Sequence, residues 1–428
     1  MATSEFARLP GFRDFPPEDF ALRAHIQTAW RRVSRRYGFS QYDGPPLESL
    51  DLYVEKSGEE IVHQLYTFVD KGGREVALRP EMTPSLARIL GDRSRGMSKP
   101  IRWFSVPQLF RYERQQRGRL REHFQWNVDI VGEAGVAADA EVLAVAIDGL
   151  RELGLTSADF AARVSDRRLL TALLLGVGIE RERVPVAFSV IDKIERMPEA
   201  KADELLRDEV GLGQSGIASV RRLLEASDLA DLGSVAGGDE GVAEELERLR
   251  EYAAILGSMG LGEYLRLDLK IVRGLAYYTG IVFELFDRQG ELRAICGGGR
   301  YDRLLELVGG EPLPAVGFGM GDVVLGELLD ERGLVPPYEP GIDYFMVAVT
   351  EGERETLLRI AHRLREKGHS VAYGLRDQSV GRQMKDASRE GARTALILGP
   401  EEMERGTVVA RDLETGEEST MAIGELEG

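Results

Sequence analysis

Residues 110–132 read FRYERQQRGRLREHFQWNVDIVG, two strand-like segments on either side of a loop that is rich in arginine. In the second segment polar and apolar residues alternate, which places Gln125, Asn127 and Asp129 on one face of a strand. Polar residues in register can simply satisfy one another, but beside a charged loop they favour the floor of a binding pocket. The stretch therefore predicts part of a long antiparallel sheet with a polar, ligand-facing surface.

The first segment ends in a cation and a carboxylate. Arg111 and Glu113 are two residues apart, and alternation along a strand would place both on the same side of the sheet. Such a pair can hold a phosphate and the amino group of a base. Residues 111–123 carry five arginines against two glutamates, a cluster that is often no more than a solvated loop. Its position at the edge of the predicted sheet favours a binding role.

The composition indicates a folded, soluble protein. A length of 428 residues predicts two or three domains. The chain is 43% hydrophobic and 30% charged, and its net charge of −17 argues against a protein that coats polyanions, so any nucleic-acid contact must be local. No secretory signal pattern and no run of about eighteen apolar residues occur, so we expect a cytoplasmic protein without a membrane span.

Residues that bind metals or cradle phosphates give weak signals. Cys296 is the only cysteine, which excludes an intramolecular disulfide and a cysteine-rich zinc site, and we expect it to be a small buried residue. The five histidines show no metal-ligand spacing, so no structural metal is expected. GGGRYD, residues 297–302, lacks the lysine of a P-loop and the spacing of a dinucleotide fingerprint, and it predicts a close-packed turn beside the active site.

The patterns along the chain predict three structural parts. Strand and hairpin patterns on both sides of a helical stretch indicate an α+β domain with a mixed, largely antiparallel sheet and a helical insertion. GLVPPYEPG predicts a linker, and alternating strands and helices after it predict a small α/β domain. The expected boundaries are 1–163 and 259–332 for the α+β domain, 164–258 for the insertion, 333–341 for the linker and 342–428 for the last domain.

A second stretch, IVRGLAYYTGIVFE at 271–284, places an always-charged arginine and two adjacent tyrosines in a strand-like run. With 110–132 and GGGRYDRL at 297–304, it resembles the histidyl-tRNA synthetases, which are class II aminoacyl-tRNA synthetases. The resemblance covers nearly the whole chain and implies the class II fold. It also extends to the amino-acid-binding turn at RPEMTPSLAR, residues 79–88, the helical insertion at 164–258, and an anticodon-binding domain at 341–428.

The resemblance implies a site for L-histidine, for ATP with Mg²⁺ and for the tRNA. Arg273 and Arg111 would be catalytic, with Arg273 near the substrate carboxylate and the α-phosphate, and Arg111 with Glu113 would bind ATP. The implied histidine-binding residues are Glu81 and Thr83 at the α-amino group, Gln125 beside them, Asp129, Tyr277 and Tyr278 at the imidazole, and Arg111 and Arg273. The implied contacts with the tRNA acceptor end are Gln116, Arg119 and Arg121.

The chemistry of this reaction suits those residue types. A carboxylate that attacks the α-phosphorus of ATP brings two anions together, so the site needs fixed cations more than a strong base. Two arginines meet that need. Selection of histidine requires polar partners for an imidazole, because groups left unpaired in a pocket disfavour other amino acids. Asp129 and the tyrosines can supply them.

Two positions depart from the family pattern. Class II enzymes normally carry an arginine in motif 3 that packs on adenine and reaches the terminal phosphate, and the matching position in VGFGMGDVVLGELL is Val324. A cation from the hairpin at 111–121 or from a helix expected at 297–308 could replace it, or the activation of histidine could be weakened. Ala276 stands where many relatives have an acidic residue, which removes a charge beside Arg273.

Two classes of function fit these features. The first is a histidine–tRNA ligase, which forms histidyl-adenylate and transfers histidine to the 3′ end of its tRNA. The second is a non-ligase paralogue, such as the regulatory subunit of ATP phosphoribosyltransferase in histidine biosynthesis. That subunit generally lacks an anticodon-binding domain, so we expect the ligase. Acidic residues at the start and arginines at the end predict an opening helix around residues 17–37. As in the family, we expect a homodimer that pairs through this helix and residues 44–50.

Overall fold

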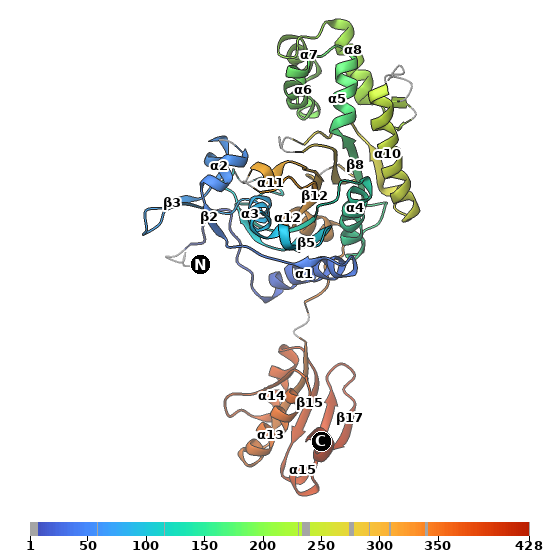
Figure 1. The fold of residues 1–428 in the computed structure, drawn as a ribbon. Coiled ribbons are helices and arrows are strands. Elements are labelled where there is room, and N and C mark those ends of the chain that lie inside the picture. Colours follow the sequence, from blue (N-terminus) through green and yellow to red (C-terminus); the bar gives the residue numbers. More distant parts are fainter. Residues whose placement is uncertain are drawn as a thin grey trace. The chain divides into compact units, whose positions relative to one another are not determined.

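The chain folds into two compact units, Met1–Pro336 and Pro337–Gly428, each with its own sheet and core. Figure 1 shows the computed structural model, coloured along the sequence. The structure describes residues 7–57, 59–114, 116–229, 231–232, 240–273, 278–290, 292–307, 310–338 and 341–427.

The first unit is built on a large mixed sheet. Among the described residues the sheet has nine strands in the order β1-β5-β7-β12-β11-β10-β8-β9, with β6 paired to β7. The pairs β1–β5 and β8–β9 are parallel and the others are antiparallel, which confirms the predicted sheet type. The strands are Ser40–Gln41 (β1), Ile101–Ser105 (β5), Gln108–Phe110 (β6), Glu122–Val131 (β7), Phe160–Asp166 (β8), Leu265–Leu267 (β9), Ile281–Asp287 (β10), Cys296–Arg300 (β11) and Ala315–Gly321 (β12).

Two helices pack against β7 at the centre of the main core. Trp30 of α1 (Pro17–Arg36) stacks on Trp126 of β7 with ring centroids 6.0 Å apart, and the Trp126 indole donates to the Ser34 hydroxyl at 2.9 Å. Helix α4 (Val136–Arg151) crosses the same tryptophan at Gly149, where a Cβ atom would lie 2.3 Å from the Trp126 ring. The apolar face of β7 is thus closed by α1 and α4, and its polar face is left for the site.

A smaller sheet and three helices lie beside the main sheet in the first unit. Strands β3 and β4 form a hairpin around the Gly72–Gly73 turn, where Val69 pairs with Glu75 in antiparallel register. The elements are β2 (Leu47–Ser49), β3 (Thr67–Val69), β4 (Glu75–Leu78), α2 (Asp51–Ser57), α3 (Thr83–Arg93) and α11 (Leu304–Leu307), with α12 (Asp322–Glu331) following β12.

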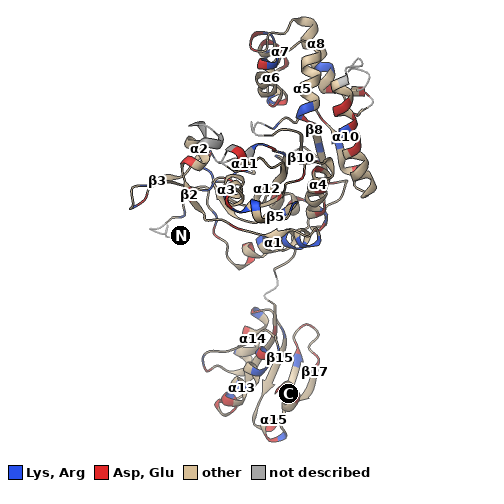
Figure 2. Ribbon diagram, viewed as in Figure 1, with Lys and Arg blue, Asp and Glu red and all other residues tan. Residues whose placement is uncertain are grey.

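The insertion leaves the sheet after β8 and returns to it at β9 (Figure 1). Its helices are α5 (Arg167–Gly176), α6 (Val184–Ile191), α7 (Glu199–Asp208), α8 (Gln214–Glu225) and α10 (Glu240–Ser258). One buried apolar cluster runs from Trp126 in the sheet to Leu223 and Leu256 in the insertion, so the helices share the core of the catalytic sheet. Acidic side chains mark α7 and α10 (Figure 2), and none of the described helices is long and apolar enough to span a membrane.

The second unit contains the predicted α/β alternation and an additional hairpin. Its sheet has the order β14-β13-β15-β16-β17, in which the first three strands are parallel and the last two add antiparallel pairs. The elements are β13 (Ile342–Ala348), α13 (Arg354–Glu366), β14 (Val371–Tyr373), α14 (Val380–Arg389), β15 (Ala392–Leu398), α15 (Pro400–Arg405), β16 (Thr407–Asp412), β17 (Glu418–Ala422) and α16 (Ile423–Glu427).

Four local predictions are wrong. The glycines of GGGRYD form strand β11 and not a turn, because they pair with β10 and β12 on both sides. The helix expected at 297–308 is limited to α11 within the described residues. Arg273 is not in a strand: its φ is 53°, and β10 begins at Ile281. Arg111 and Glu113 follow the end of β6 at Phe110 and therefore do not alternate on a strand.

Substitution of Gly149 by alanine should lower the free energy of unfolding by about 1–3 kcal/mol, because the new methyl group enters space that Trp126 occupies. Urea titration followed by tryptophan fluorescence measures the change. Gly257→Ala in α10 is the matched control: nothing lies within 4 Å of its Cβ position, so helix propensity should add up to about 1 kcal/mol of stability. Equal effects of the two substitutions would contradict tight packing of α4 on β7.

Candidate active site

A small polar pocket of about 80 Å³ lies over the polar face of β7. β7 contributes Gln125, Asn127 and Asp129, as the alternation predicted. Residues from distant parts of the chain complete it, so the fold gathers most of the predicted histidine-binding residues around one space. They are Glu81, Thr83, Arg111, Arg273 and Tyr278, with Tyr301, Phe318 and three glycines.

The glycines of β11 and β12 give this pocket its room. Gly317 pairs with Asp129 across the strands, and Gly319 pairs with Asn127. A Cβ atom on Gly317 would lie 2.2 Å from the Asp129 carboxylate, and one on Gly319 would lie 2.8 Å from the Gln125 amide carbon. On Gly297 it would lie 1.6 Å from the Arg273 guanidinium, so any side chain at these positions would displace the polar groups.

Asp129 is the buried carboxylate of the pocket. The hydroxyl of Tyr301 donates a hydrogen bond to its Oδ1. Burial raises the pKa of Asp129 to about 7, and the hydrogen bond from Tyr301 opposes that shift. A carboxylate with this pKa changes charge near neutral pH and can accept a hydrogen bond from an imidazole N–H.

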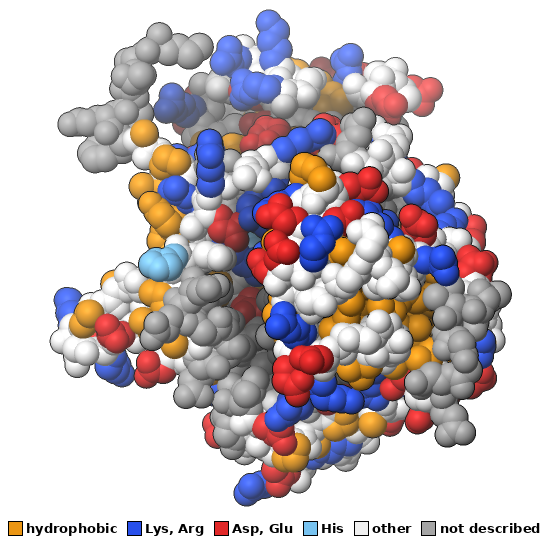
Figure 3. Space-filling model, turned by 90° about the horizontal axis from the view of Figure 1, so that it is seen from above, with side chains coloured by type: hydrophobic (Ala, Val, Ile, Leu, Met, Phe, Trp, Pro, Cys, Tyr) orange, Lys and Arg blue, Asp and Glu red, His pale blue; other side chains and the backbone are white. Residues whose placement is uncertain are grey.

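A larger cleft of about 640 Å³ adjoins the pocket and shares Arg111, Gln125 and Arg273 with it. Its lining holds five arginines against two glutamates, in a protein whose net charge is −17. Figure 3 shows acidic and basic side chains mixed over the face seen from above. The excess of arginine in the cleft is thus a local feature that suits a polyanion. The arginines are Arg111, Arg119, Arg196, Arg273 and Arg293, and the glutamates are Glu113 and Glu284.

Arg273 stands where the pocket and the cleft meet, in a strained conformation. It is the non-glycine residue with a positive φ within the described ranges, and this left-handed backbone costs on the order of 1–3 kcal/mol. Its Nη1 forms an ion pair with Glu284 Oε1 at 2.6 Å, and its guanidinium lies 5.7 Å from the Tyr278 ring centre. Strain of this size at a cleft wall is typical of a functional position.

Arg111 and Glu113 both line the cleft although they lie outside β6. Arg111 Nε donates to the Pro80 carbonyl at 3.0 Å, next to Glu81. Glu113 forms an ion pair with Arg119 at 2.8 Å. Of the two hairpin arginines predicted to contact tRNA, Arg119 lines the cleft and Arg121 does not. The guanidinium of Arg121 packs over the Tyr112 ring instead.

The cleft lining also contains uncharged side chains. His123, Leu120 and Val324 are among them, and the valine is nearly buried at 8% exposure. Burial, with Arg111 and Arg13 nearby, lowers the pKa of His123 to about 3, so its imidazole is neutral at physiological pH. A flat neutral ring beside apolar side chains suits a nucleobase.

Several lining residues were missed from the sequence. Tyr301, Arg293 and Arg196 lie in a strand end, a loop and the insertion, and no periodicity links them to the pocket. The GGGRYD motif was the available signal for Tyr301. Tyr277 and Ala276 lie outside the described residues. Among the described residues, no group of three or more His, Cys, Asp or Glu side chains could hold a metal ion.

Comparison with known proteins assigns the family. The family model for histidyl-tRNA synthetase matches residues 11–321, and the model for the anticodon binding domain matches residues 344–428. The chain belongs to the histidyl-tRNA synthetase family. The fold agrees with the class II synthetase architecture that the sequence predicted, a catalytic domain with a helical insertion and a separate C-terminal domain.

Relatives in this synthetase family match the chain over most of its length. The histidine–tRNA ligase of Opitutus terrae is 44% identical over 98% of this chain and 96% of its own. The chloroplastic and mitochondrial histidine–tRNA ligase of Arabidopsis thaliana is 41% identical over 97% of this chain and 85% of its own. The crystal structure of histidyl-tRNA synthetase from Nostoc sp. PCC 7120 has a TM-score of 0.84 at 24% identity over 99% of each chain, which is a likeness of fold.

The raised pKa of Asp129 predicts how stability without ligand depends on pH. Between about pH 4, where an unfolded aspartate titrates, and pH 7, the folded state keeps a proton that the unfolded state has lost. The contribution of Asp129 to the free energy of unfolding therefore falls as pH rises, by at most about 1.4 kcal/mol per pH unit. Thermal melts should show Asp129→Asn gaining stability relative to wild type from pH 5 to pH 7.

Tyr301→Phe provides the companion measurement. It removes the hydrogen bond that opposes the shift, so the pH at which the wild-type decline ends should move upward. A stability difference between Asp129→Asn and wild type that stays constant over this range would contradict a raised pKa.

Proposed function

We propose that this protein is an active histidine–tRNA ligase that works in the cytoplasm as a homodimer. In the first step a carboxylate oxygen of L-histidine attacks the α-phosphorus of ATP, and pyrophosphate leaves with its Mg²⁺. In the second step a hydroxyl of the terminal adenosine of the tRNA attacks the carbonyl carbon of histidyl-adenylate, and AMP leaves as the hydroxyl loses its proton. The observation that carries this proposal is a polar pocket that adjoins an arginine-rich cleft.

Histidine would occupy the small pocket. Asp129 would accept a hydrogen bond from the imidazole, and Tyr278 with its neighbour Tyr277 would face the same ring. Glu81, Thr83 and Gln125 would meet the α-amino group. The support for these roles is that all of them except Tyr277, which is not described, line one cavity whose size is set by glycines.

ATP, with Mg²⁺ as part of the substrate, would occupy the larger cleft. Arg111 and Arg273 border both cavities, which supports a role for them where the histidine carboxylate would approach the α-phosphate. There they would stabilise the charge that develops on the phosphoryl oxygens. Glu113 would accept a hydrogen bond from the adenine amino group, and His123 and Val324 of the cleft lining would contact the base.

Arg293 would replace the missing motif 3 arginine. The position that a Cβ atom would take on Gly118 lies 3.7 Å from Cδ of Arg293 and 3.0 Å from a methyl group of Val324. Arg293 and Val324 are therefore close to each other. Arg293 donates to the side-chain oxygen of Gln116, and no carboxylate of the described residues forms an ion pair with it. An exposed guanidinium without an acidic partner is available to the terminal phosphates of ATP.

The tRNA would meet two parts of the chain. Gln116, Arg119 and Arg121 would contact the acceptor end, where Gln116 and Arg119 are exposed. The second unit, whose residues 344–428 match the anticodon-binding domain, would contact the anticodon. The same unit disfavours the regulatory-subunit paralogue, as do relatives at 40–44% identity that carry the name histidine–tRNA ligase.

Histidine-dependent exchange of pyrophosphate into ATP, followed by charging of a histidine tRNA transcript, tests the function. The wild-type protein should perform both reactions. Arg273→Ala should lower kcat for exchange by about 100-fold to 1000-fold, because it removes a fixed cation from the transition state. Arg221→Ala, which changes ion pairs with Glu199 and Asp203 on the insertion surface, is the control with unchanged kcat. A protein that binds histidine but neither exchanges pyrophosphate nor charges tRNA would instead support the paralogue.

The role of Arg293 is tested by the dependence of exchange on ATP concentration. Arg293→Ala should raise the KM for ATP about tenfold to 100-fold, the loss of a hydrogen bond to a charged group, and should leave the KM for histidine unchanged. Arg288→Ala, in the same loop but outside the cleft lining, is the control. An unchanged KM for ATP in Arg293→Ala would mean that another cation fills the gap at Val324.

A further inference from the structure

The strained backbone at Arg273 is held by the helical insertion. Arg167, the first residue of α5, donates from Nη1 to the Val272 carbonyl at 2.8 Å and to the Arg273 carbonyl at 3.1 Å. Its backbone N–H donates to the Gly280 carbonyl at 3.0 Å. Both ends of the segment from residue 272 to 280, which carries Arg273 and Tyr278, are therefore tied to the beginning of α5.

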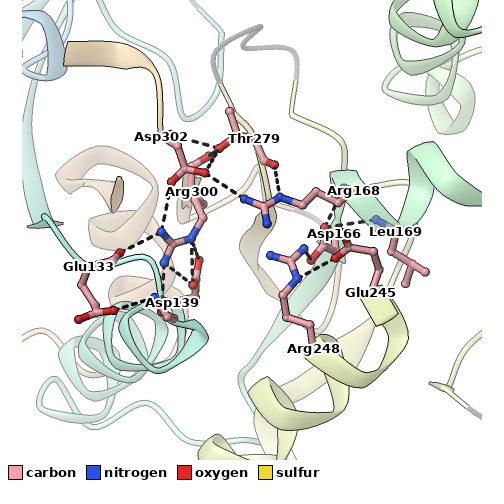
Figure 4. A network of polar contacts seen from close by, with 11 residues as sticks. Glu133, Asp139, Asp166, Arg168, Leu169, Glu245, Arg248, Thr279, Arg300 and Asp302 are labelled. Atoms are coloured by element: carbon pink, nitrogen blue, oxygen red, sulfur yellow. Dashed lines mark hydrogen bonds and ion pairs between the residues drawn. The ribbon is translucent and has the colours of Figure 1, made fainter. Parts of the chain in front are cut away.

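The next residue of α5 strengthens the second tie. Arg168 donates from Nε to the Thr279 carbonyl at 3.1 Å and pairs with Asp302 at 3.1 Å (Figure 4). Thr279 in turn donates from its hydroxyl to Asp302 at 2.8 Å. Asp302 also accepts a hydrogen bond from Arg300, so this network of hydrogen bonds extends to strand β11, which lines the pocket.

The beginning of α5 is itself fixed by other helices of the insertion. Asp166 caps α5 by accepting from the Arg168 backbone N–H at 2.8 Å, and it forms an ion pair with Arg248 of α10 (Figure 4). The guanidinium of Arg167 lies 4.7 Å from the ring centre of Phe188 in α6. Three insertion helices thus determine where the Arg167 guanidinium stands.

We propose that Arg167 is a positioning residue for the activation of histidine, through which the helical insertion sets the backbone conformation of Arg273. The inference rests on the proposed function, because it assigns Arg167 to the adenylation step of that reaction. The carbonyls of Val272 and Arg273 both accept hydrogen bonds from the Arg167 guanidinium. These hydrogen bonds stabilise the left-handed backbone of Arg273, which would otherwise relax to a less strained conformation. Relaxation would move the Arg273 guanidinium off Gly297, away from the junction of the pocket and the cleft.

This arrangement connects the insertion to the adenylation step. A change in the position of α5 would move the Arg167 guanidinium and with it the backbone of Arg273. Arg167 forms its two hydrogen bonds with the carbonyls of Val272 and Arg273 only when α5 and residues 272–273 have this relative position. These hydrogen bonds therefore distinguish this position of α5 from a displaced one. The insertion would then influence the rate of histidyl-adenylate formation.

Pyrophosphate exchange by the full-length Arg167→Ala protein tests the proposal. We expect kcat to fall about 10-fold to 100-fold, because a displacement of about 1 Å at a reacting group can cost that much, with little change in the KM for ATP. Arg167→Lys should show an intermediate kcat, since an ammonium group cannot reproduce the two-carbonyl geometry of the guanidinium as well. If the alanine variant does not fold, the lysine variant carries the test.

A double-variant comparison separates positioning from general stability. If Arg167 acts through Arg273, single-turnover adenylation by Arg273→Ala should not slow further when Arg167→Ala is added. Arg221→Ala, on the surface of the same insertion, should leave kcat unchanged. Two results would overturn the proposal. One is an active wild-type protein whose kcat for exchange is unchanged by Arg167→Ala, and the other is a double variant in which the two losses of adenylation rate are fully additive. A wild-type protein without exchange activity would instead refute the proposed function itself.

Discussion

The contact between polar side chains and a glycine surface is the constraint on which the site depends. Asp129, Gln125 and Arg273 lie against Gly317, Gly319 and Gly297, where even a single methyl group would overlap them. Antiparallel register fixes this match, because a shift by one residue would put each glycine opposite an apolar neighbour on the other face. Glycine weakens a strand, but here β11 and β12 are central strands that are paired on both sides.

The buried ion pair behind this surface holds β11 in place. Arg300, 1% exposed, donates to Asp139 of α4 at 2.6 and 3.0 Å, and burial raises the pKa of Asp139 although Arg300 opposes the shift. Such a pair adds little net stability, yet removal of one partner costs about 3–5 kcal/mol because the other charge stays buried. Here the ion pair fixes the orientation of the end of β11. Because Arg300 faces α4, the next residue, Tyr301, faces Asp129.

Local patterns in the sequence predicted much of the framework. The alternation in β7 gave the pocket floor, and the acidic start and basic end of the first helix gave α1 within one residue of its boundaries. The resemblance carried most of the remaining site residues. Three features required the fold: the left-handed Arg273, the glycine strand, and Arg293 beside Val324. Each depends on a partner distant in sequence, and an isolated GGG pattern is equally typical of a turn.

The arginines of the cleft repel one another. Burial lowers the pKa of Arg119, Glu113 opposes that shift, and the neighbouring Arg293, Arg111 and Arg196 lower the pKa further. Glu113 and Glu284 each pair with one arginine, which leaves Arg111, Arg196 and Arg293 as cations without a carboxylate partner in the described structure. A bound triphosphate would reduce the repulsion between the arginines. This reduction would contribute to the free energy of triphosphate binding. The same local excess in a chain of net charge −17 directs an anionic nucleic acid toward this cleft and away from the acidic faces of the insertion.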